Sequence, residues 1–156
     1  MPKNDINKVA LFILYTNDLR YLLQKRTDDA PRIPGFWGFF GGSIKEGETI
    51  VSSVKREALE EIDYKLLDPH LVFEQEFYLT TDHQTVKKTI DEGYMWVFIE
   101  LFKGNRTSIN VYEGQNFGWF KKNETDSLQM MDHDKFVLEK VEEYLLNENF
   151  SSGMVL

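Results

Sequence analysis

The sequence predicts an α/β fold in which a mixed β-sheet lies between helical layers. Several short segments are rich in apolar and aromatic residues, as strands are. Two segments with helical spacing flank these strands from distant parts of the chain, and each must bury one face against a sheet. The chain has 156 residues, of which 42% are hydrophobic. That length provides one substantial core and is too short for two ordinary domains, so we predict a single domain over residues 1–156.

The first part of the chain contains three predicted strands. Residues 9–15 form a continuous apolar run, which is typical of a strand buried on both faces. An Asn-Asp turn leads into a second strand over residues 20–24. A loop over residues 27–36, marked by proline and glycine, precedes a short aromatic strand over residues 37–40. This strand leads into a glycine pair, which we interpret as a loop built for close backbone approach.

A helix that ends near Ile62 follows, and three more strands come after it. The strand patterns cover residues 71–80 and 94–102, and a shorter one covers residues 116–120. Because these strands lie between two helical segments, the pattern favours a sheet with a helix on each side.

An amphipathic helix is predicted to close the fold. Asp132 or Asp134 is available to cap its first turn. Its apolar residues follow helical spacing: Val137, Leu138, Val141, Tyr144 and Leu145. Residues 147–156 are predicted to be a flexible C-terminal tail.

Three glutamates gather on one turn of the first helix, Glu57, Glu60 and Glu61. At about 100° per residue, Glu61 lies beside the stripe that should face the core. That stripe is predicted to contain Val51, Val54, Ala58 and Ile62. A solvated helix face is the simpler interpretation of such glutamates. However, Lys55 and Arg56 are expected to point elsewhere, and an ionised carboxylate beside a buried stripe is costly unless it is paired or bound to a metal. The pattern therefore predicts a cation site.

The segment from the glycine pair through this helix resembles the signature of the Nudix hydrolase family. The fixed positions are Gly42, then Glu48, then the run Arg56-Glu-Ala-Leu-Glu-Glu-Ile-Asp-Tyr64. The match is complete except at Asp63, where the family has glycine. We expect a left-handed backbone there, which aspartate adopts more readily than most residues. The resemblance covers residues 8–147 and implies the Nudix α/β/α sandwich.

The resemblance also implies a metal site and its ligands. The implied ligands are Gly42, through its carbonyl oxygen, and Glu57, Glu60, Glu61 and Glu113. It further implies that Arg56 pairs with Glu48 and fixes the loop against the helix. Glu113 could instead be an ordinary turn residue, and the general base stays open between Glu60, Glu61 and Glu113. Hard oxygen ligands without histidine or cysteine favour Mg²⁺ or Mn²⁺.

Substrate-binding residues are harder to identify. Arg26, helped by Lys25, occupies the position where relatives place a cation against phosphate, although two charged residues could simply end a strand. Asp132 and Asp134 lie where some relatives bind the edge of a purine base. Capping of the last helix is the simpler explanation for aspartates at these positions. The three histidines show no metal-ligand spacing, so we interpret them as surface or structural residues.

The function implied is metal-dependent hydrolysis of a diphosphate linkage in a nucleoside diphosphate joined to another group. A nucleoside triphosphate cleaved to monophosphate and pyrophosphate is the first choice. Nucleotide sugars and dinucleoside polyphosphates are the alternative substrates. A non-catalytic nucleotide-binding sensor is an alternative of another class, but such members of the family usually lose glutamates that this helix keeps.

The amino-acid composition of the chain limits which kinds of partner it can bind. The formal net charge of -8 argues against binding long nucleic acid, while a small nucleotide remains compatible. The chain has no cysteine, no apolar signal core and no membrane-length run, so we predict a cytoplasmic protein, monomeric or homodimeric, that does not contact membranes. The sequence does not identify the base, the sugar or the leaving group of the substrate.

Overall fold

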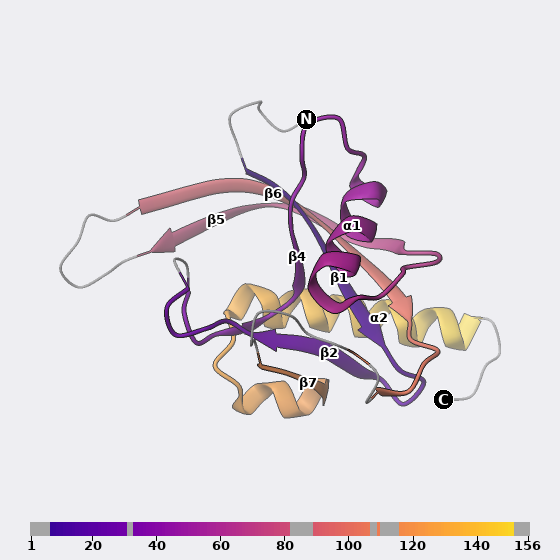
Figure 1. The fold of residues 1–156 in the computed structure, drawn as a ribbon. Helices are drawn as coiled ribbons and strands as arrows, with labels where there is room; N and C mark the ends of the chain where they lie inside the picture. The colour runs from indigo at the N-terminus through magenta and orange to yellow at the C-terminus, as the bar shows by residue number, and fades with distance from the viewer. Residues whose placement is uncertain (1–6, 31–32, 82–88, 107–108, 110–115, 152–156) are drawn as a thin grey trace.

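The computed structural model of the protein describes residues 7–30, 33–81, 89–106, 109 and 116–151 (Figure 1). The strands in this part of the chain are β1 (Asn7–Tyr15), β2 (Arg20–Lys25), β3 (Trp37–Gly38), β4 (Phe40–Ser43), β5 (His70–Thr81), β6 (Thr89–Leu101) and β7 (Asn116–Lys121). The helices are α1 (Ile50–Ile62), the 3₁₀ helix η2 (Lys122–Ser127) and α2 (Asp132–Ser151).

The central strand of the sheet is β1. It runs parallel to β6 and antiparallel to β2 and β4, so the sheet is mixed as predicted. The strand order is β3-β2-β1-β6-β5, with β4 paired to β1 and β7 paired to β2. β5 and β6 form a long antiparallel hairpin that extends beyond the two helices in Figure 1.

The two long helices cover opposite faces of the sheet, with α1 in front of β1 and α2 behind it in Figure 1. Alternation along β1 explains this arrangement, because successive side chains point to opposite faces. Ala10, Phe12 and Leu14 pack in one core cluster with the buried residues of α1. Ile13 packs in a second cluster with Val137 and the rest of the buried face of α2. The prediction that residues 9–15 are buried on both faces is confirmed.

Both ends of α1 are fixed by local contacts. At the start, the Thr49 hydroxyl accepts the backbone N–H of Ser52 at 3.0 Å, and the Ser52 hydroxyl accepts the N–H of Thr49 at 2.9 Å. This reciprocal arrangement satisfies two donors that the helix leaves unpaired. At the end, Asp63 has φ 53° and ψ 40°, which confirms the left-handed conformation expected where the family has glycine.

Several predicted boundaries are wrong. The glycine pair belongs to β4 and not to a loop, and β6 begins at Thr89 although residues 89–93 lack a strand-like apolar run. This part of β6 is held by backbone pairing with β5, which starts with Thr89 opposite Thr81. Such pairing does not require apolar side chains.

The C-terminal helix also differs from its prediction. α2 continues to Ser151, so the chain does not leave the helix at residue 147. Asp132 and Asp134 lie inside its first turn and not ahead of it. An ionised carboxylate at this end interacts favourably with the positive end of the helix. Tyr21 fixes this helix to the sheet, because its hydroxyl donates to Glu142 at 2.9 Å.

Within the described residues, no helix combines the length and the apolar character that crossing a membrane requires.

Candidate functional site

The candidate site is built where β4 passes between β1 and α1. Gly41 has φ 130°, and a β-carbon on it would overlap the carbonyl oxygen of Ala10 and lie 2.7 Å from the Cα of Leu11. A β-carbon on Gly42 would lie 2.7 Å from Oε1 of Glu57. The glycine pair therefore allows the β4 backbone to approach β1 on one side and a helix carboxylate on the other.

Two glutamates of α1 turn toward this backbone. The Glu57 side chain is only 12% exposed. Glu61 is partly buried and accepts the backbone N–H of Gly41 at 3.0 Å. The pKa of Glu61 is raised to about 8, mainly by burial; the Gly41 N–H acts in the opposite direction, and the neighbouring charges of Glu57 and Glu60 contribute to the rise. The ionised form of Glu61 is therefore costly in the protein without a cation.

The expected pair between Arg56 and Glu48 is present. Nε of Arg56 lies 2.7 Å from Oε2 of Glu48, and its Nη2 lies 3.0 Å from Oε1. This two-point contact holds the pKa of Glu48 at about 2, with help from the backbone N–H of Lys45. Nη2 also donates to the backbone oxygen of Ser43 at 3.2 Å. Arg56 therefore connects the helix to the end of β4 and to the loop between β4 and α1.

The prediction that Arg56 points away from the glutamates is wrong. Its Nη1 donates to Glu57 at 3.0 Å and to Glu60 at 3.1 Å. The helical angle of a residue determines only the direction in which its side chain leaves the helix. The long Arg56 side chain can therefore reach both the preceding loop and the next turn of the helix. The carboxylates are therefore linked by one guanidinium, while Glu60 itself remains 53% exposed.

The buried stripe of α1 also differs from its prediction. Val54, Ala58 and Ile62 are buried, whereas Val51 is 38% exposed. Ser53 is buried in its place, with a hydroxyl that has no hydrogen-bond partner among the described residues. α1 packs on β4 and β1. Ser53 is fully buried and Glu57 lies against Gly42 of β4, so the packed side of the helix includes these two residues, whereas Val51 lies toward solvent.

The acidic side chains do not form a ready-made cage. In the described part of the chain, no three acidic or histidine side chains are arranged to hold one ion. Glu57 and Glu61 lie against each other and against the glycine pair, whereas Arg56 holds Glu60 to one side. Glu113 lies outside the described residues. The oxygens of Glu57, Glu61 and the nearby β4 backbone are nevertheless the hard donors that Mg²⁺ and Mn²⁺ prefer.

The residues predicted to contact substrate lie at the opposite end of β2 from its turn with β1. Lys25 is the last residue of β2 and pairs with Trp37 of β3. Arg26 follows, and its backbone N–H donates to Phe36 at 2.8 Å. The carboxylate of Asp134 approaches this strand pair, because a β-carbon on Gly38 would lie 3.5 Å from its Oδ2. Burial raises the pKa of Asp134 to about 7.

Two of the histidines, predicted to be surface or structural residues, contact neighbouring side chains near the surface. His70 contacts Tyr144 at 2.6 Å, and His133 contacts Gln75 at 3.4 Å. His83 lies outside the described residues.

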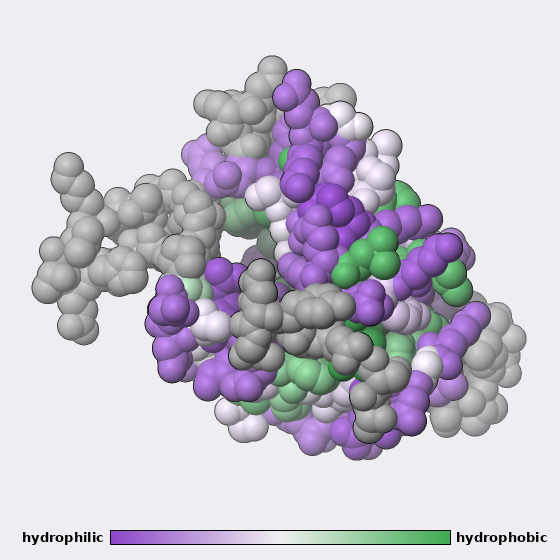
Figure 2. Space-filling model, viewed as in Figure 1, coloured by the Kyte–Doolittle hydropathy of each residue, from purple (hydrophilic) through white to green (hydrophobic). Residues whose placement is uncertain are grey.

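Figure 2 shows the face of the molecule that carries α1. Hydrophilic residues gather over the helix, and hydrophobic residues appear beside and below it. The surface over α1 is thus polar and has apolar surface beside it, which suits a ligand with both a charged and an apolar part.

The glycine pair provides a test of this geometry. Replacing Gly41 with alanine should lower the free energy of unfolding by about 2 to 4 kcal/mol, because the new methyl group would strike the β1 backbone. Gly47→Ala is the matched control, since Gly47 also has a positive φ, 83°, but no atom within 4 Å of the added carbon. Urea unfolding measures both variants. Equal losses would show that backbone strain, and not the close approach of β4 to β1, explains the effect.

Comparison with known proteins places this site in context. The NUDIX domain model matches residues 6–144. Nucleoside triphosphatase NudI of Escherichia fergusonii is 32% identical over 112 residues, which cover 69% of this chain and 77% of the relative. NudI of Escherichia coli strain SE11 is 32% identical over 114 residues, with the same coverage.

Solved structures confirm the predicted fold. The MutT protein from Methanosarcina mazei Go1 superposes with a TM-score of 0.73 at 16% identity, covering 92% of this chain and 98% of that one. The MutT protein from Bacillus halodurans has a TM-score of 0.63 at 27% identity, covering 86% of this chain and 80% of that one. The residues matched by the family model include the glycine pair, Glu48 and the whole of α1.

Proposed function

We propose that this chain, which belongs to the Nudix family and is a hydrolase of that family, cleaves a nucleoside triphosphate to a monophosphate and pyrophosphate with the help of Mg²⁺ or Mn²⁺. The single observation that carries the proposal is the placement of Glu57 and Glu61 against the Gly41-Gly42 backbone. Relatives named nucleoside triphosphatase support the choice of substrate.

The donor set fits a divalent cation. Glu57, Glu61 and the Gly42 carbonyl would hold it, and Glu60 and Glu113 would complete the ligands. Bound there, the cation would neutralise the phosphate oxygens and lower the pKa of a water. A cation would also offset the cost of keeping two carboxylates side by side and partly out of water. This benefit explains why an otherwise unfavourable arrangement is built into the helix.

Arg56 and Glu48 would act as positioning residues. Their two-point ion pair, together with the Arg56 contact to the Ser43 backbone, fixes β4 and its following loop relative to α1. Because Arg56 also contacts Glu57 and Glu60, it limits where these carboxylates can point. Precise placement of charged groups is the main contribution that a protein makes to this type of hydrolysis.

The remaining site residues would bind the substrate. We propose that Arg26 and Lys25 contact phosphate oxygens beyond the cleaved linkage. Asp134 would read the base: a carboxyl with a pKa of about 7 is partly neutral near that pH, so it can donate as well as accept a hydrogen bond. Which carboxylate removes the proton from water stays open between Glu60, Glu61 and Glu113.

Product analysis tests the proposal. Canonical nucleoside triphosphates, a nucleotide sugar and a dinucleoside polyphosphate would each be incubated with the protein and separated by ion-exchange chromatography. We expect a monophosphate and pyrophosphate from a triphosphate, no reaction in excess chelator, and recovery with Mg²⁺ or Mn²⁺. Hydrolysis that continues in excess chelator would overturn the metal-dependent mechanism. Turnover only of the nucleotide sugar or the dinucleoside polyphosphate would replace the substrate and keep the site.

The monomeric or homodimeric state and the cytoplasmic location predicted from the sequence stay predictions, as does the single-domain assignment of residues 1–156.

A further inference from the structure

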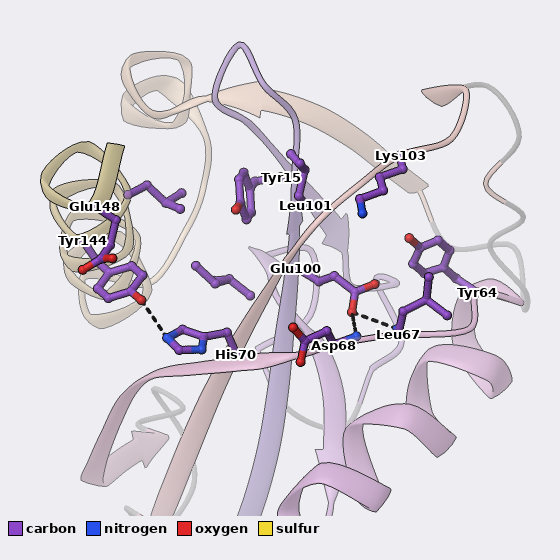
Figure 3. Close-up of a pocket in the computed structure, with 12 residues that line it drawn as sticks. Tyr15, Tyr64, Leu67, Asp68, His70, Glu100, Leu101, Lys103, Tyr144 and Glu148 are labelled. Carbon is purple, nitrogen blue, oxygen red and sulfur yellow. Dashed lines mark hydrogen bonds between the residues drawn. The ribbon is translucent and has the colours of Figure 1, made fainter. Parts of the chain in front are cut away.

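A cavity lies away from the acidic turn of α1, at the end of the sheet where β1 and β6 finish and β5 begins. Its volume is about 400 Å³, within the range of small-molecule sites. Figure 3 shows its walls, which come from the sheet, from the segment after α1 and from the second half of α2. None of the residues predicted for the hydrolytic site lines it.

The walls of this cavity are held by specific hydrogen bonds. A carboxylate oxygen of Glu100 accepts the backbone N–H groups of Leu67 at 2.9 Å and Asp68 at 2.6 Å, which ties the segment after α1 to β6. On the other side, Tyr144 of α2 contacts His70 of β5 at 2.6 Å, and their rings stack with centroids 5.6 Å apart. The dashed lines in Figure 3 mark these contacts. The cavity is therefore bounded by braced elements on both sides.

The chemistry of the lining favours a positively charged ligand. The cavity is lined by three carboxylates, Asp68, Glu100 and Glu148, and by one ammonium, that of Lys103. Because Glu100 already accepts two backbone donors, the exposed Asp68 is better placed than Glu100 to meet a new partner. An excess of negative charge, in a chain with a formal net charge of -8, repels phosphates. Without a bound metal cation, this lining therefore favours a positively charged ligand over a phosphate.

Aromatic and apolar residues add a second preference. Three tyrosines line the cavity, Tyr15, Tyr64 and Tyr144, together with Leu101 and Leu145. Tyrosine rings attract organic cations through their faces, and the leucines accommodate an aliphatic stem. A hydrated inorganic cation would gain little from this apolar part, whereas an alkyl amine or alkyl guanidine would use both parts.

We propose that this cavity binds a small organic cation, an ammonium or guanidinium group on an aliphatic stem. The charged group would lie near Asp68, and the stem would lie along the tyrosines and leucines. This proposal is independent of the proposed hydrolytic function, since the two sites share no residue.

Amide chemical-shift mapping with agmatine tests this proposal. The titration would be run in saturating Mg²⁺, so that the carboxylates of α1 do not compete for the probe. We expect saturable shifts around Asp68, Leu101 and Tyr144, weakening as salt is added. 1,4-Butanediol, an uncharged molecule with a similar stem, should cause much smaller shifts. Shifts centred on α1, or equal responses to the two probes, would overturn the proposal.

Variants separate the contributions of charge and ring. Asp68→Asn should weaken agmatine binding about three- to fivefold, whereas Asp126→Asn, at an exposed carboxylate on η2, should leave it unchanged. Tyr144→Leu should weaken binding about two- to fivefold, and Tyr144→Phe should not, although both lose the hydroxyl contact to His70. Unchanged binding in Asp68→Asn, or equal weakening in the two Tyr144 variants, would contradict the assignment.

Discussion

Replacing Glu61 with glutamine is expected to slow hydrolysis by at least about a hundredfold, equivalent to about 2.7 kcal/mol of transition-state stabilisation. Glutamine keeps the shape of the side chain and can still accept the N–H of Gly41, but it lacks the charge that a cation needs. Steady-state kinetics in saturating Mg²⁺ measure the loss. Glu139→Gln, at an exposed glutamate of α2, is the control and should keep full activity.

The same variant should be more stable than the wild type without metal. Because burial raises the pKa of Glu61 to about 8, the wild-type protein loses stability as pH rises from the ordinary glutamate range through that value. Glutamine does not ionise, so the variant should gain about 2 kcal/mol of unfolding free energy over the wild type at pH 9. This gain corresponds to a Tm about 4 to 8 °C higher, and the two Tm values should match near pH 4. A lower Tm at pH 9, or near-normal turnover, would show that Glu61 is a structural residue.

Replacing Arg56 with lysine should lower the rate by about tenfold or more and also lower the Tm. Lysine keeps the charge but cannot reproduce the two-point contact with Glu48 while it also contacts Glu60 and the Ser43 backbone. Arg20→Lys is the matched control: like Arg56, Arg20 pairs with more than one carboxylate, here Asp18 and Glu124, but outside the site. It should leave the rate unchanged.

The pH dependence of Arg56→Lys follows from Glu48. The pKa of Glu48 is held at about 2, so the pair stabilises the folded protein above the ordinary glutamate range, and this stability is lost as pH falls toward 2. The Tm difference between wild type and Arg56→Lys should therefore be largest near neutral pH and shrink in acid. A difference that does not change with pH would show that the ion pair contributes little.

Features that depend on nearby residues were predictable from the sequence. The two-sided burial of β1 follows from its unbroken apolar run, and the left-handed conformation of Asp63 follows from its position after the helix. The turn of α1 that gathers Glu57, Glu60 and Glu61 follows from spacing and from the family signature.

Contacts made by the ends of long side chains, and contacts between distant segments, were not predictable in the same way. Helical angles did not show that Arg56 turns back to the acidic turn, or that Gly41 donates its N–H to Glu61. The polar start of β6 is held by pairing with β5, which its own residues do not indicate. The ion pair between Arg20 of β2 and Glu124 of η2 likewise joins two segments that are distant in the sequence.

Direct measurement of bound Mn²⁺ tests the central claim that Glu57 and Glu61 hold a divalent cation against the β4 backbone. Electron paramagnetic resonance would measure the concentration of free Mn²⁺ while the wild type, Glu61→Gln and the Glu139→Gln control are each titrated with Mn²⁺. We expect Glu61→Gln to weaken Mn²⁺ binding by at least about tenfold and the control to match the wild type. Equal Mn²⁺ affinity in all three proteins would contradict the assignment of the ion to this turn of α1.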